Sequence, residues 1–171
     1  MHPELQAFRP SFEAVLFLLL QRWRLWLGQD AVRALSIGFD STNTEICISL
    51  LTDNEPYLMR DNLEPLAEPW PVASWRLFDI GRSAKHTFPD AADLTSWMRT
   101  KASALEGSDE EVRGGSERLN EELKQFFFEA ATSARVLAEI RSFKRMAEPF
   151  RIRVQWYFER RPSLNYSLVT E

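Results

Sequence analysis

The chain has 171 residues, of which 44% are hydrophobic and 27% charged, and its net charge is −4. This balance is typical of a globular protein with a sizeable core, and it argues against general affinity for nucleic acid. Cys47 is the only cysteine, which excludes an internal disulfide. Because the chain also lacks the pattern of a cleaved signal peptide, we expect a cytoplasmic protein.

The first predicted element is a helix over residues 11–27, with Ser11 as its N-cap and Gly28 just past its end. Its apolar positions follow helical spacing. They are Phe12, Val15, Leu16, Leu19, Leu20, Trp23, Trp26 and Leu27. Phe17 and Leu18 widen the apolar stripe, so we expect a buried helix covered on two sides. Its apolar run is too short to span a membrane.

Residues 34–51 predict an antiparallel hairpin with one buried face. Leu35, Ile37 and Phe39 alternate with small residues, and a polar turn at residues 40–43 follows. Ile46, Ile48 and Leu50 then alternate in the same way. Cys47 falls on the other face, where we interpret it as a small packing side chain.

Residues 52–71 contain four prolines, which excludes a regular helix or a central strand. We expect an ordered loop there, with a short strand near residues 57–59 and a third strand over residues 74–80. Trp70 and Trp75 bracket Pro71. They either clamp this loop onto the core or form a ridge that contacts a partner.

Two further helices are predicted in the second half of the chain. The first begins at Asp90 and stops at Gly107. The second covers residues 116–146 and ends before Pro149. Between them, Ser108 and Glu111 have the spacing of a capping box. Because glycines follow closely at 114 and 115, we expect any helix in this acidic stretch to be short or mobile.

The last elements are two strands over residues 150–159 and 164–169, which we expect to form a second hairpin. Charge is segregated in this half of the chain. Residues 106–122 contain seven acidic and two basic residues, and residues 135–161 contain eight basic and three acidic ones. Such blocks attract each other or an oppositely charged partner.

These patterns predict one α+β domain over residues 1–171. We expect an antiparallel sheet of about four to six strands, with the helices packed mainly on one face. The sequence leaves the oligomeric state open.

No motif in the sequence predicts a catalytic, metal or cofactor site. The two histidines, His2 and His86, have no ligand partners at metal-binding spacing, and no phosphate-binding glycine loop is present. Cys47 lacks a neighbouring base. We therefore expect no cofactor and favour a non-enzymatic protein, while an enzyme of unrecognised class stays open.

The leading hypothesis is a protein-binding module, in which a charged patch steers encounter and aromatic anchors hold the complex. Its candidate residues are Trp70, Trp75, Glu110, Glu111 and Glu117. The alternative is a nucleic-acid or anionic-ligand binder that uses a basic sheet face. Its candidate residues are Arg151, Arg153, Tyr157, Arg160 and Arg161.

The order of these elements resembles a family of small bacterial α+β proteins of unknown biochemistry. Some members are encoded beside polymorphic toxins and described as immunity proteins. The similar features are the helix Phe12–Leu27, the hairpin SIGFDSTNTEICISLLT, the segment EPWPVASWRLFDI and the two helices that follow. The resemblance implies a partner protein, a toxin that the chain neutralises by occlusion, and it supplies no site residue.

Overall fold

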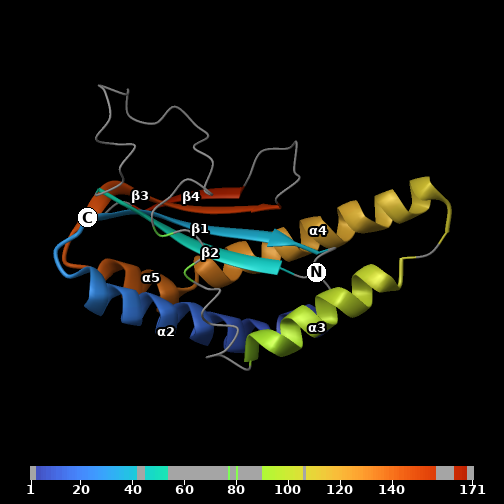
Figure 1. Ribbon diagram of the computed structural model, residues 1–171, viewed down its shortest axis with the longest axis horizontal. Helices are drawn as coiled ribbons and strands as arrows, with labels where there is room; N and C mark the ends of the chain where they lie inside the picture. Colours follow the sequence, from blue (N-terminus) through green and yellow to red (C-terminus); the bar gives the residue numbers. More distant parts are fainter. Residues whose placement is uncertain are drawn as a thin grey trace, which may run out of the picture.

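The computed structural model describes residues 3–41, 45–53, 77, 80, 90–105, 107–156 and 164–168. Their elements, in order, are α1 (Pro3–Ala7), α2 (Arg9–Leu27), β1 (Val32–Asp40), β2 (Glu45–Thr52), α3 (Asp90–Ser103), α4 (Asp109–Ala131), α5 (Ala134–Arg141), β3 (Met146–Trp156) and β4 (Leu164–Leu168) (Figure 1). Helices and strands occupy separate stretches of the chain, which confirms the predicted α+β class.

The predicted N-terminal hairpin forms as β1 and β2, which pair antiparallel. The prediction of one buried face is wrong, because Ser36 and Ser49 on the opposite face are buried as well. Leu35, Ile37 and Phe39 lie opposite Leu50, Ile48 and Ile46, respectively. All six belong to the core or pack against it. This alternation sets the register, because a slip of one residue would turn every apolar side chain to the opposite face.

Within the described residues, the sheet has four strands in the order β2-β1-β3-β4 and is mixed, so the prediction of a fully antiparallel sheet is wrong at one pair. The central strands β1 and β3 run parallel, whereas β3 and β4 form the predicted antiparallel pair. A parallel pair requires a long crossover connection. Helices α3, α4 and α5, which lie between β2 and β3 in the sequence, are part of that crossover.

The single helix predicted over residues 116–146 is also wrong, because the chain breaks it at Thr132 and Ser133. The Thr132 hydroxyl donates to the Phe128 carbonyl oxygen at 2.8 Å. The Ser133 hydroxyl accepts from the Val136 amide at 3.4 Å and caps α5. Both side chains offer the backbone a local alternative to helical bonding, so α4 ends and α5 begins here.

The acidic stretch before residue 116, predicted to be short or mobile, belongs to the continuous helix α4. The capping box predicted at Ser108 and Glu111 is present and starts the helix. Gly115 lies buried against Leu105, where a Cβ atom would come within 2.7 Å of Leu105 Cδ2. This glycine therefore permits a close approach between α4 and the segment that precedes it.

Of the third strand predicted over residues 74–80, only Leu77 and Ile80 are described. Leu77 forms an antiparallel bridge with Leu50, whose amide donates to the Leu77 carbonyl oxygen at 3.1 Å. Both Leu77 and Ile80 are buried. The strand predicted near residues 57–59 lies outside the described residues.

Four phenylalanines join α2, α4 and β1 in the core. Phe12 on α2 packs against Phe126 and Phe127 on α4, with ring centroids 5.8 and 5.0 Å apart. Phe39 on β1 lies 5.1 Å from Phe127. Each such aromatic pair contributes about 0.5–1.5 kcal/mol beyond the burial of its area. The sheet is thereby fixed to α2 and α4. In Figure 1, α2 lies below the sheet, whereas α4 extends past the ends of β1 and β2.

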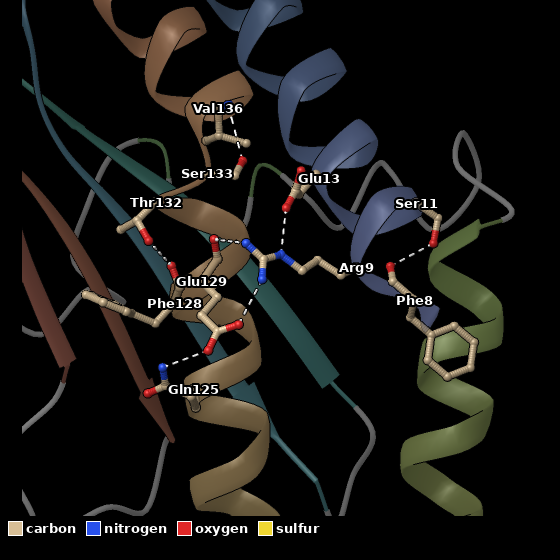
Figure 2. Close-up of polar contacts among 10 residues, drawn as sticks. All are labelled: Phe8, Arg9, Ser11, Glu13, Gln125, Phe128, Glu129, Thr132, Ser133 and Val136. Atoms are coloured by element: carbon tan, nitrogen blue, oxygen red, sulfur yellow. Dashed lines mark hydrogen bonds and ion pairs between the residues drawn. The ribbon is translucent and has the colours of Figure 1, made fainter. Parts of the chain in front are cut away.

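A polar clamp holds the first turn of α2 to the last turns of α4 (Figure 2). The Arg9 guanidinium donates to Glu13 on its own helix at 2.8 Å and to the Glu129 carboxylate on α4 at 2.9 Å. Gln125 donates to the second oxygen of Glu129 at 3.0 Å. These contacts and the phenylalanine cluster fix the orientation of α2.

Candidate functional site

The acidic candidates for partner binding lie on the first part of α4. Glu110, Glu111 and Glu117 are all exposed there. Trp70 and Trp75, the aromatic candidates, lie outside the described residues. The structure therefore places three of the five predicted partner-binding residues, and it places them on one helix.

Glu111 forms part of the capping box that starts α4. Its carboxylate accepts from the Ser108 amide and from the Ser108 hydroxyl, each at 2.8 Å. The hydrogen bond from the Ser108 backbone, followed by the one from its side chain, lowers the pKa of Glu111 below its ordinary value. Its charge is thus held at the helix N-terminus, where the helix dipole favours an anion.

The basic candidates for anion binding lie on β3 as far as they are described. Arg151 is exposed and Arg153 half-buried, and both project from the same face of that strand. Tyr157, Arg160 and Arg161 lie outside the described residues. Arg151 and Arg153 are two residues apart on β3 and therefore share a face, as the predicted alternation requires.

Arg153 belongs to a polar row that crosses all four strands. Its neighbours at the same level of the sheet are Ser49, Ser36 and Asn165. The Ser36 and Ser49 side chains are buried, and the Ser36 hydroxyl has no hydrogen-bond partner among the described residues. This face of the sheet is therefore polar in its centre, and its two arginines lie toward the β4 edge.

Cys47 is buried on β2, and its sulfur lies 3.6 Å from the Ser49 hydroxyl. This environment is typical of a packing thiol. His86, the only base that the sequence offered it, lies outside the described residues. Among the residues that the structure describes, no three His, Cys, Asp or Glu side chains come together as a metal site would require.

A surface that sequence reasoning missed lies on the outer side of α2. Leu18, Leu25 and Trp26 are 43%, 76% and 68% exposed, and they are the large apolar side chains that the described residues expose. Arg22 is exposed among them. We call Leu18, Arg22, Leu25 and Trp26 the α2 outer patch. The prediction that α2 is covered on two sides is therefore wrong at Leu18 and Trp26.

Trp26 is not a free side chain, because it packs edge-on against Trp23. Their ring centroids are 5.1 Å apart and the rings are inclined by 77°. Trp23 is half-buried and packs in turn against the core. An exposed aromatic ring that is already held in position loses little conformational entropy when a partner covers it.

The flank of α2 beside this patch is used for packing against α5. Arg24 donates to Glu139 at 2.6 Å, and the Glu139 side chain is only 7% exposed. The Arg135 guanidinium lies 4.5 Å from the centre of the Phe17 ring. These contacts cover one side of α2 and leave the outer patch beyond them.

The sequence carries a signal for this patch. Leu18, Arg22 and Leu25 are spaced by four and three residues, so they lie along one side of a helix, and that side contains an arginine. A charged residue in the middle of an apolar stripe indicates a solvent-facing side. Because apolar residues occur around most of α2, the sequence alone did not identify this side as exposed.

Within the described residues, no helix is long and apolar enough to cross a membrane. No protein-family model, curated protein or solved structure matches the chain. The surfaces described above are therefore the features of the chain that bear on its function.

Proposed function

We propose that this protein is a non-enzymatic protein-binding module of the cytoplasm and that its partner is a toxin, which it neutralises by occlusion. The observation that carries the proposal is the α2 outer patch. Leu18, Leu25 and Trp26 are exposed together on one rigid helix. Clustered exposed apolar residues mark interaction sites, and Trp and Arg are enriched among residues that dominate binding energy.

The acidic first part of α4 supplies the second element of the mechanism. Glu110 and Glu117 are exposed there, near a helix start that already carries Asp109 and Glu111. Such a patch accelerates encounter with a basic partner without adding much affinity. We propose that these acids steer the toxin and that the α2 outer patch holds it.

This proposal is tested by affinity capture of the tagged chain from cells of the organism that encodes it, at low and high salt. The wild type should retain one stoichiometric protein at high salt. The variant Leu25→Gln/Trp26→Gln should lose that protein at both salt concentrations. Capture of nothing by the wild type, or equal capture by both chains, would contradict the proposal.

A second candidate function is the binding of nucleic acid or another anionic ligand by the sheet face of β3. Arg151 and Arg153 lie on one face, beside a buried Ser36 hydroxyl without a hydrogen-bond partner among the described residues. Binding of this kind falls steeply with added salt. This candidate replaces the first if the wild type captures nucleic acid at low salt but not at high salt. The variant Arg151→Ala/Arg153→Ala should then capture no nucleic acid at either salt concentration.

We also infer that the helices of the whole chain cover mainly the apolar face of the sheet. The core residues that β1 and β2 place on one face of the sheet and the phenylalanine cluster support this arrangement. Hydrogen exchange tests it, because the amides of α2 and α4 that pack against the apolar face should be among the best protected of the chain.

A further inference from the structure

The α2 outer patch has the geometry of a helix-packing seam. Leu18, Arg22 and Leu25 follow a spacing of four and three residues along α2, and the exposed Gln29 lies two residues past the helix end. This is the spacing of the positions that two packed helices present to each other. A straight stripe of this kind fits a helix along its length better than it fits a loop or a strand.

Arg22 sets the charge that the occupant must carry. Among the described residues, no carboxylate forms an ion pair with Arg22, although Arg9, Arg24 and Arg33 each have one. A helix that covers the two leucines also removes water from the guanidinium between them. Burying an unpaired charge is costly, so the occupant needs a carboxylate opposite Arg22.

A second copy of this chain does not satisfy that requirement. Closed dimers form through the same patch on both subunits. Because Arg22 lies between Leu18 and Leu25, a two-fold pairing of this stripe brings the two Arg22 side chains toward each other. Two like charges removed from water at one interface oppose association.

An anionic membrane surface fits the patch less well than a protein does. Exposed Trp and Leu side chains insert at lipid interfaces, but stable attachment of a short amphipathic surface needs several basic residues nearby. The patch contributes only Arg22. The neighbouring Arg24 and Arg135 are engaged with Glu139 and Phe17, respectively.

We propose, resting on the protein-binding function above, that the α2 outer patch docks an amphipathic helix of the partner protein. The apolar stripe of that helix covers Leu18, Leu25 and Trp26. An Asp or Glu side chain within the stripe pairs with Arg22. The partner thus extends the helical layer of this protein by one helix.

Site-specific photo-crosslinking in cells of the encoding organism tests this assignment. A benzoylphenylalanine at Gln29 probes the end of the seam without altering the patch, and the same residue at Arg118, exposed on α4, is the control. We expect the Gln29 probe to attach to one segment of one partner, with helical periodicity and an acidic residue in its apolar stripe. The Arg118 probe should not attach to that segment.

Charge exchange then tests the predicted ion pair. Arg22→Glu should weaken binding of the purified partner at least about 10-fold. Changing the crosslinked acidic residue of the partner to Arg should restore most of that loss. Arg99→Glu makes the same charge change on an exposed position of α3, outside both proposed surfaces, and should leave the dissociation constant within threefold of wild type.

The remaining outcomes distinguish this inference from the proposed function. A crosslink to a partner segment that lacks helical periodicity or an acid, or a failure of the charge exchange, overturns the docked helix but leaves a protein-binding module. A crosslink to a second copy, or sedimentation with phosphatidylglycerol vesicles that requires Trp26, overturns it in favour of that occupant. The absence of any crosslinked protein contradicts both proposals.

Discussion

Arg24 and Glu139 join α2 to α5 through an ion pair whose acidic partner is buried. The Arg24 side chain is 30% exposed and that of Glu139 only 7%. Removing the arginine leaves a carboxylate without its counter-charge in a poorly solvated position. Removing one member of such a pair therefore lowers the stability of the fold more than replacing both.

We predict that Arg24→Ala lowers the free energy of unfolding by about 2 kcal/mol, a value reduced for the partial exposure of Arg24. The double variant Arg24→Met/Glu139→Leu should recover most of that loss, because no charge is then buried. Urea denaturation monitored by circular dichroism measures both. Equal losses in the single and the double variant would show that the ion pair has no such role.

Glu111 gives the protein a pH-dependent helix cap. Its pKa is lowered in the folded protein by hydrogen bonds from Ser108, below the ordinary value of 4.5. A carboxyl group with a lowered pKa stabilises the fold above its ordinary pKa, and that stability is lost as pH falls through the folded value. The cap should therefore weaken below pH 4.5.

The variant Glu111→Gln tests this sign. We expect it to be less stable than wild type at pH 7, and this difference to shrink at an acidic pH at which the Glu111 carboxyl is protonated. Ser108→Ala should lower stability by about 1 kcal/mol at pH 7, because it removes the N-cap. A Glu111→Gln difference that is unchanged between the two pH values would be inconsistent with the ionised cap.

At the scale of elements, the start of α4 contains two adjacent glycines with different surroundings. A Cβ atom at Gly114 meets nothing within 4 Å, whereas one at Gly115 comes within 2.7 Å of Leu105 Cδ2. Alanine is favoured over glycine in a helix interior by about 0.5–1 kcal/mol. The two positions thus form a matched pair.

Gly114→Ala should raise the free energy of unfolding by about 0.5–1 kcal/mol. Gly115→Ala should raise it by less, because the Leu105 side chain must move to admit the new methyl group. Thermal unfolding of the two variants under the same conditions measures the difference. Equal stabilisation by both substitutions would mean that Leu105 does not pack against Gly115.

Local patterns predicted the elements that depend on local chemistry. The alternation of Leu35, Ile37 and Phe39 specified a strand, and the spacing of Ser108 and Glu111 specified a cap, because both signals lie within a few residues. The parallel pairing of β1 with β3 was not predictable in this way. It depends on how the whole helical crossover packs, which no short pattern records.

The candidate site shows the same limit. The alternation placed Arg151 and Arg153 on one face correctly. The exposure of Leu18, Leu25 and Trp26 was missed, because their apolar character alone favours burial and only packing decides which side of α2 the sheet and α5 cover. The break at Thr132 and Ser133 was missed because the apolar periodicity continues through it.

At the scale of the whole molecule, we expect substitutions in the α2 outer patch to affect partner binding much more than the stability of the fold. Its large side chains face solvent, so Leu25→Gln/Trp26→Gln should change the free energy of unfolding by no more than about 1.5 kcal/mol, most of which is the lost contact between Trp26 and Trp23. By contrast, Phe127→Ala in the core should cost about 3–5 kcal/mol. Urea denaturation of the two variants checks this contrast. A large loss in the patch variant would indicate that the patch serves the fold.

The most direct test of the central claim is calorimetric titration of the purified partner with wild-type protein, with Leu25→Gln/Trp26→Gln and with the control Arg99→Glu. Truncating residues that dominate an interface typically costs 2 kcal/mol or more each. We therefore predict that the patch variant binds the partner about 100-fold more weakly than wild type and that the control binds it equally well. A dissociation constant for the patch variant within threefold of wild type would contradict it.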